Sequence, residues 1–220
     1  MILSFSASGS RLNRESGPIG YRPKVILKGF LFMKYTVKKE YLDAKEFLVI
    51  KGLGKLYDPG VSSADSDKNA WDIIKQRLID GSVECLKEIS GSNIVYMLFC
   101  NTCIRNDKEK CYDCGYDIAC ENINNSTPAE GFEIVRINPC EYVVFDCSFN
   151  NETSMPNAHE KTDAVFWKEW LAENPYVSAI DNPANWLGNG FAAIELYSPF
   201  NPDANKFDVK MWYPVISKDS

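Results

Sequence analysis

The sequence is poor in the features that mark two large classes of protein. The chain has 220 residues and a single histidine, His159. No Ser-His-Asp or Cys-His arrangement is evident. No apolar run approaches the roughly 20 residues that span a bilayer. The opening MILSFSASGS lacks the basic segment and the long apolar segment of a secretory signal. We therefore expect a cytoplasmic protein without membrane contact and without a histidine-activated nucleophile.

Basic residues become scarce after the first forty positions. Residues 1–40 hold eight Lys and Arg against two acidic residues, whereas residues 41–220 hold sixteen against twenty-eight, so the segments carry +6 and −12. Phosphate binding needs clustered Lys and Arg, so we expect no specific binding of nucleic acid by this chain alone. An acidic main domain favours a cationic or neutral small ligand. The KGLG sequence at 51–54 has no helix at the right place after it, so a phosphate loop is not expected.

Eight cysteines in a chain without a secretory signal indicate thiols or metal ligands rather than a disulfide framework. Four of them form two Cys-x-x-Cys pairs, Cys100 with Cys103 and Cys111 with Cys114. On a hairpin these pairs bring four thiolates together, as a structural zinc requires. The alternatives are reduced thiols on a mobile hairpin or two disulfides. The other four cysteines are expected to be small core residues, namely Cys85, Cys120, Cys140 and Cys147.

Apolar spacing and turn residues predict two series of elements along the chain. In AWDIIKQRLID, Trp71, Ile74 and Leu78 recur at helical spacing after the capping candidates Ser66 and Asp67. The same reasoning predicts helices over 67–80, 82–89 and 160–173, and strands over 34–39, 46–55, 93–100, 115–121, 131–138, 141–149, 190–198 and 207–216.

The second series repeats the order of the first. LVIKG corresponds to VVFDC, WDIIKQRL to FWKEWL, and YMLFC to IELYS, with weak identity but a consistent pattern. Repeats of this size predict an α+β domain of duplicated strand-helix-strand-strand units with pseudo-twofold symmetry. Its antiparallel sheet would carry one main helix per half. We assign residues 1–32 to an N-terminal arm or linker and residues 33–220 to this domain.

The second half carries YVVF at 142–145, Trp167 and Trp170 in the predicted helix, IELY at 194–197 and WYPV at 212–215. These motifs in this order resemble the gyrase-inhibitor-like (GyrI-like) family of effector-binding domains. In that family a Tyr-x-Val-Phe strand precedes a Trp-rich helix, and the matching residues are 142–145 with Trp167 and Trp170. IELY at 194–197 is similar to the family's Phe-Glu-x-Tyr strand, and WYPV at 212–215 to its last strand. The first half fits through VIKG at 49–52 and YDIACE at 116–121.

The resemblance covers about residues 33–217 and implies a small-molecule-binding domain of the transcription-regulation, multidrug-binding type. In the family this domain often follows an AraC-type helix-turn-helix. Residues 8–32 resemble the tail and linker of such a DNA-binding domain, but its recognition helices are absent. The resemblance therefore implies a stand-alone binder or a truncated AraC-type regulator.

Glu195 is the candidate charged residue of the pocket. Strand alternation places Ala193, Glu195 and Tyr197 on one face. A carboxylate among apolar groups is costly unless a partner compensates it, and a cationic ligand can do so through charge and cation–π contact. The alternative is an exposed edge-strand glutamate paired with a lysine. The family's ligand-recognising glutamate matches Glu195, and candidate walls are Tyr116, Tyr142, Trp167, Trp170, Tyr197 and Trp212, with Trp186 as a lid or a loop anchor.

Two functions stay open at this point. One is a module that senses or sequesters a small amphipathic, cationic organic molecule. The other follows from family members that hydrolyse small electrophiles, which implies Glu195 as general base with Tyr116 or Tyr142 assisting. His159 is expected in the loop before the second main helix, as a cap or in solvent. The acidic pocket and the missing nucleophile favour binding over catalysis, with no cofactor beyond the structural zinc.

Overall fold

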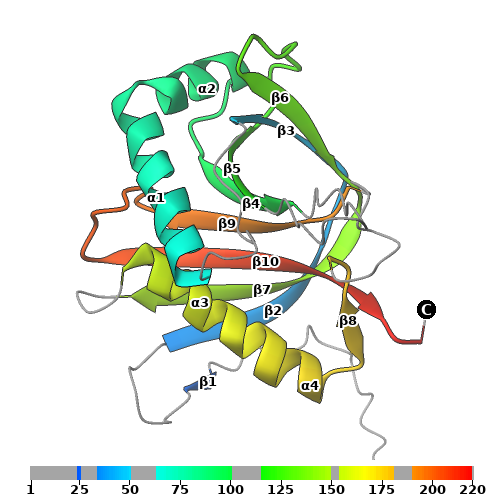
Figure 1. Ribbon diagram of the computed structural model, residues 1–220. Helices are drawn as coiled ribbons and strands as arrows, with labels where there is room; N and C mark the ends of the chain where they lie inside the picture. Colours follow the sequence, from blue (N-terminus) through cyan, green and yellow to red (C-terminus); the bar gives the residue numbers. More distant parts are fainter. Residues whose placement is uncertain are drawn as a thin grey trace, which may run out of the picture.

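The computed structural model describes residues 24–25, 34–50, 63–100, 115–149, 154–180 and 190–219. They form a ten-stranded sheet in which every pair of neighbouring strands is antiparallel (Figure 1). The strands are β1 (Lys24–Val25), β2 (Lys34–Leu42), β3 (Lys45–Ile50), β4 (Tyr96–Cys100), β5 (Gly115–Glu121), β6 (Phe132–Ile137), β7 (Cys140–Phe149), β8 (Tyr176–Ser178), β9 (Ala192–Ser198) and β10 (Phe207–Ser217). The helices are α1 (Ser63–Ile79), α2 (Ser82–Ser90), α3 (Met155–Val165), the π-helical η1 (Phe166–Trp170) and α4 (Leu171–Glu173).

The order of the strands shows the duplication directly. It runs β1-β2-β7-β10-β9-β4-β5-β3-β6, with β8 on the end of β10. The β9–β4 pair is the centre, followed outward by β10 and β7 on one side and by β5 and β3 on the other. Each half thus supplies a strand, a helical segment and two further strands. The α+β fold with duplicated strand-helix-strand-strand units is confirmed, with β2 and β6 each pairing with the opposite half.

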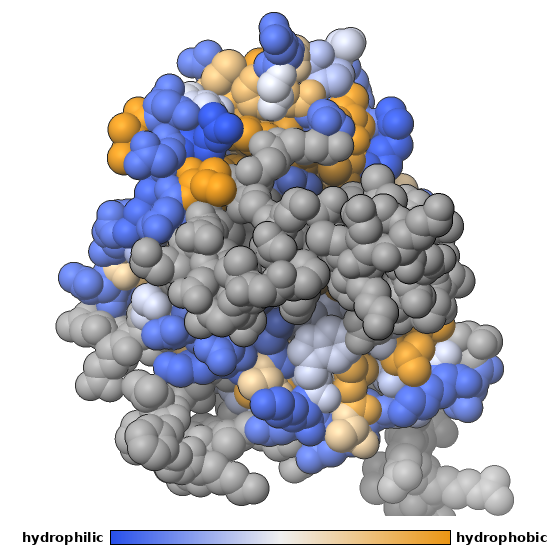
Figure 2. Space-filling model, in the orientation of Figure 1, coloured by the Kyte–Doolittle hydropathy of each residue, from blue (hydrophilic) through white to orange (hydrophobic). Residues whose placement is uncertain are grey.

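The core occupies both faces of the sheet. On one face, helical residues such as Leu86 of α2 and Phe166 of η1 form a cluster with sheet residues such as Phe145 of β7. On the other face a second cluster includes Phe47 and Leu98. Figure 2 shows mostly hydrophilic residues over the coloured part of α1, and Asp72 and Gln76 of this helix are exposed. Among the described helices, none has the length and apolar character to cross a membrane.

The sequence pattern predicts that the second main helix begins at residue 160, but the helix begins at Met155. Ser154 caps it, because its Oγ accepts a hydrogen bond from the backbone N–H of Asn157 at 3.4 Å. A proline, Pro156, occupies the first helical positions, where its missing N–H carries no penalty. The early start places His159 inside α3, so its expected position in a loop is wrong. The wide π-helical turn of η1 follows, a feature often found near functional sites.

Candidate functional site

Glu195 lies at the centre of the sheet, on the face that carries the helices. Its neighbours across β9 are Met97 of β4 and Met211 of β10. The side chain is 2% exposed, and alternation along β9 groups it with Ala193 and Tyr197. Because β9 is a central strand, Glu195 is not an exposed edge-strand residue. A carboxylate in this position has lost its hydration, so groups of the protein must compensate its charge.

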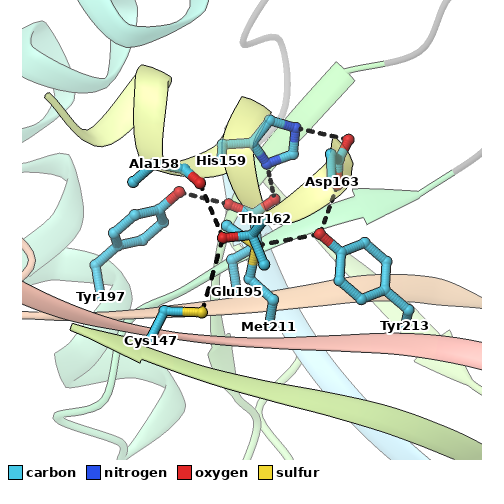
Figure 3. A network of polar contacts seen from close by, with 9 residues as sticks. All are labelled: Cys147, Ala158, His159, Thr162, Asp163, Glu195, Tyr197, Met211 and Tyr213. Atoms are coloured by element: carbon cyan, nitrogen blue, oxygen red, sulfur yellow. Dashed lines mark hydrogen bonds and ion pairs between the residues drawn. The ribbon is translucent and has the colours of Figure 1, made fainter. Parts of the chain in front are cut away.

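Two side chains bind the carboxylate of Glu195 (Figure 3). The hydroxyl of Tyr197 donates a hydrogen bond to Oε2 at 2.8 Å. The Nδ1 atom of His159 lies 2.8 Å from Oε1. Since His159 comes from α3, this ion pair joins the helix to the middle of the sheet.

The network continues from His159 toward the surface. Its Nε2 atom lies 3.3 Å from Oδ2 of Asp163, one helical turn further along α3. The other oxygen of Asp163 accepts a hydrogen bond from the hydroxyl of Tyr213 at 2.5 Å. The side chains of Glu195, His159 and Asp163 are 2%, 15% and 32% exposed. Figure 3 shows this line of polar groups running along α3, from the buried strand to the partly exposed carboxylate.

The surroundings of His159 favour its positively charged form. Each ring nitrogen faces a carboxylate oxygen, so the ring lies between two acceptors of negative charge, whereas a neutral imidazole would turn a lone pair toward one of them. The contact at Nδ1 is an ion pair without the geometry of an N–H hydrogen bond. Burial by itself lowers the pKa of His159, but the charges of Glu195 and then Asp163 outweigh it and hold the pKa well above its ordinary value.

Small and sulfur-containing side chains fill the space around this network. The hydroxyl of Thr162 donates to the carbonyl oxygen of Ala158 at 2.9 Å and lies 3.9 Å from the sulfur of Cys147. Tyr213 also lies 3.2 Å from the sulfur of Met211. Burial raises the pKa of the Cys147 thiol to about 12, so this cysteine is neutral and is no nucleophile at neutral pH.

Aromatic rings continue the site on the side of Asp163. The ring of Phe166 stacks on Tyr213 with centroids 4.1 Å apart and an interplanar angle of 11°. Trp167 and Trp170, both predicted as walls, pack on Phe166 at centroid distances of 4.8 and 6.1 Å. Both tryptophans are therefore one ring removed from the hydrogen-bonded network, whereas Tyr197 binds Glu195 directly.

Several solved structures resemble this fold. One is a Staphylococcus aureus protein assigned to bacterial transcription regulation, with 14% identity, a TM-score of 0.53, and coverage of 81% of this chain and 97% of that one. A second is SAV2435 bound to tetraphenylphosphonium, with 13% identity, a TM-score of 0.53 and coverage of 82% and 93%. A third is EcmrR in a complex with DNA, with 11% identity and a TM-score of 0.50, where the match covers 83% of this chain and 58% of EcmrR. The chain shares their fold.

That shared fold is what the GyrI-like resemblance implied. No protein-family model matches the sequence, and no curated protein is significantly similar to it. At these identities the likeness concerns the fold, so the roles of residues must be argued from the geometry of this chain.

Two predicted wall residues lie on the wrong face of the sheet for a site at Glu195. Tyr142 belongs to the core cluster on the opposite face, and Trp212 packs against the same cluster. The cause is strand register, because Met211 pairs with Glu195 and therefore turns its neighbour Trp212 away. The indole N–H of Trp212 instead donates to the Oε1 atom of Glu40 at 3.0 Å. The prediction that Tyr142 and Trp212 wall the same pocket as Glu195 is therefore corrected.

The remaining predicted residues lie outside the part of the chain whose side chains are described. Tyr116 and Cys100 belong to β5 and β4 by their backbones alone, and Trp186, Cys103, Cys111 and Cys114 lie outside the described residues. Within the described residues, no group of three or more His, Cys, Asp or Glu could hold a metal ion. The zinc site at the two Cys-x-x-Cys pairs stays a prediction, which elemental analysis of purified protein can test.

The other four cysteines are predicted from the sequence to be core residues. Cys120, Cys140 and Cys147 are buried, but Cys85 is exposed, so the prediction is wrong for Cys85.

His159 and Asp163 are the site residues that the sequence analysis missed. Their spacing of four places them on one helical face, a signal that was visible in HEKTD once the helix was extended to Ser154. The Ser154-Met155-Pro156 sequence is a typical helix start. Reading it as such would have aligned His159 with the sheet-facing side of α3.

Proposed function

We propose that this chain binds small amphipathic organic cations, with the Glu195 carboxylate as the counter-charge, as an effector-sensing or sequestering domain. The observation that carries the proposal is a carboxylate that is 2% exposed at the centre of the sheet and lies 2.8 Å from Nδ1 of His159. Burying an ion pair costs free energy that an apolar pair would not, so its presence favours a function in binding.

The balance of charge in the network favours a cation over an anion. Glu195 and Asp163 contribute two negative charges, and the imidazolium of His159 neutralises one of them. The hydroxyls of Tyr197 and Tyr213 both donate to these carboxylates, so they are already engaged as donors. An anionic ligand would thus meet net negative charge, whereas a cation would be attracted.

Aromatic rings flank both ends of the network and suit an amphipathic ligand. Trp71 of α1 contacts Tyr197 edge-on, with centroids 5.5 Å apart and an interplanar angle of 90°. At the other end Phe166 stacks on Tyr213. Ring faces attract organic cations and bury their apolar groups, which supports a lipophilic cation as ligand.

The structural comparison supports the same class of ligand. SAV2435, which shares the fold, was solved with tetraphenylphosphonium bound, a permanent cation with four phenyl groups. A ligand of this kind would approach Glu195 from the side of His159 and Asp163, because exposure increases in that direction.

The hydrolase alternative has less support. A general base must reach the water that it activates, but Glu195 is 2% exposed and lies behind Tyr197 and His159. Tyr142, one of the two tyrosines proposed to assist, lies on the other face of the sheet.

Calorimetric titration of the full chain with tetraphenylphosphonium tests the proposal. We expect binding that weakens by about 1–3 kcal/mol in Glu195→Gln, the scale of a hydrogen bond to a charged group. The matched control is Glu160→Gln, because Glu160 is an exposed carboxylate on α3. Equal losses in both variants, or no binding to the unmodified chain, would contradict the proposal.

A further inference from the structure

The carboxylate proposed to receive a ligand cation already holds a cation of its own. The imidazolium of His159 reaches Oε1 of Glu195 at 2.8 Å from α3. Because the Glu195 side chain is 2% exposed and His159 lies against this oxygen, a cationic ligand that reaches it competes with the like-charged imidazolium for the same place. The exchange raises the question of what happens to the charge of the displaced imidazolium.

We propose that binding of a cation at Glu195 displaces the imidazolium of His159 and releases its proton to solvent. This proposal rests on the proposed function, because it needs a cation that binds at Glu195. It adds a coupling between ligand binding and pH, so that protons and ligand cations compete for the same buried charge.

The ion pairs of His159 give the first reason for proton release. In the free protein the imidazolium lies between two carboxylates, with Nδ1 2.8 Å from Oε1 of Glu195 and Nε2 3.3 Å from Oδ2 of Asp163. Once the ligand occupies Glu195, Nδ1 loses the negative charge beside it and faces a second positive charge. The proton at Nδ1 then leaves for water or buffer, and the neutral ring keeps one N–H that still donates to Asp163.

The charged surroundings of His159 give the second reason. The charges that raise the pKa of His159 are those of Glu195 and Asp163, against the opposing effect of burial. When a ligand neutralises Glu195, burial and one carboxylate remain, and burial favours the neutral imidazole.

Within the described parts of the chain, we identify no other group facing the network that would keep the proton. From β9 and β10, Tyr197 and Tyr213 act as donors to the two carboxylates. From β7, the thiol of Cys147 is already protonated. On α1, Lys75 is paired at the surface with Asp203 at 2.7 Å. The neighbouring helical segments also carry Glu160 and Lys161 of α3, Asp72 of α1, and Lys168 and Glu169 of η1. None of these groups is among the charges that shift the pKa of His159.

The coupling predicts how affinity changes with pH. In the range where the free protein holds the proton and the complex does not, each pH unit should raise the affinity for a permanent cation about tenfold, as one-proton linkage requires. A permanent cation is the right probe because it does not titrate itself. Tetraphenylphosphonium meets this condition.

The test is calorimetry of the full chain with tetraphenylphosphonium at one pH between about 7 and 8, in two buffers that differ in ionisation enthalpy. We expect a difference in observed heat equal to about one proton released per ligand. His159→Gln should bind with no buffer dependence, and Glu160→Gln should behave like the unmodified chain. If His159→Gln does not fold, the tenfold increase in affinity per pH unit in the unmodified chain provides the same test.

The possible failures are distinguishable. Binding that depends on Glu195 but releases no proton would overturn the exchange and leave the proposed function intact. Proton release that persists in His159→Gln would also overturn it. An absence of binding at every pH would overturn the proposed function, and the exchange with it.

Discussion

The two halves of this fold contain the same order of elements but bury different chemistry beneath their helices. In the first half α1 covers the sheet with Trp71 and Ile74, and α2 adds Leu86, all apolar and buried. In the second half α3 places His159, Thr162 and Asp163 in the corresponding layer, where they form polar contacts. The same architecture therefore folds with either an apolar or a charged interior.

The contrast is sharpest where the halves meet. Met97 of β4 and Glu195 of β9 face each other across the central strand pair. In the duplicated pattern, Phe99 of β4 is equivalent to Tyr197 of β9, and each lies two residues after Met97 or Glu195. The first half shows that the fold needs no charge at this position. Buried charges that the fold does not require are typical of functional sites, where local rules of stability are broken.

Removing one member of the charged pair should have the largest effect. His159→Leu leaves Glu195 buried without its cation, and we expect a loss of about 3–5 kcal/mol in the free energy of unfolding at neutral pH. Met97→Leu, the control in the first half, conserves volume and should cost less than about 1.5 kcal/mol. Chemical denaturation followed by fluorescence measures both. Equal small losses would show that the second half is no more sensitive than the first.

The pH dependence of stability should be next in size. Because the folded pKa of His159 is raised, its ion pairs stabilise the protein fully below the unfolded value of about 6.5. This stabilisation is lost as pH rises through the higher folded pKa, and each unit of pKa difference is worth about 1.4 kcal/mol. Denaturation curves across this range should thus show declining stability in the unmodified chain. His159→Gln should lack that decline, and an identical decline in both proteins would refute the assignment.

The smallest change in stability should come from making the second half resemble the first. The double substitution Glu195→Met with His159→Leu replaces the ion pair by apolar groups, which is often neutral or stabilising by about 1–4 kcal/mol. We expect it to unfold at a denaturant concentration no lower than that of the unmodified chain, yet to lose tetraphenylphosphonium binding. A double variant as unstable as His159→Leu alone would mean that the pair stabilises the fold.

The sequence predicted the sheet well because each strand carries its own local signal. Alternation in FAAIELY placed Glu195 and Tyr197 together correctly. The relative faces of Glu195, Tyr142 and Trp212 depend on the pairing register between strands, which no single strand encodes. His159 was misplaced because the buried residues of α3 are Met155, the small Ala158 and the polar Thr162, so the apolar periodicity that reveals a helix is weak there.

The most direct test of the charged centre is a proton NMR titration of the imidazole, which is unambiguous because His159 is the single histidine of the chain. We expect a titration midpoint well above 6.5 in the unmodified protein. In Glu195→Gln the midpoint should fall, while Glu160→Gln should leave it unchanged. A midpoint near 6.5 that does not respond to Glu195→Gln would contradict the claim that His159 is the internal cation of this site.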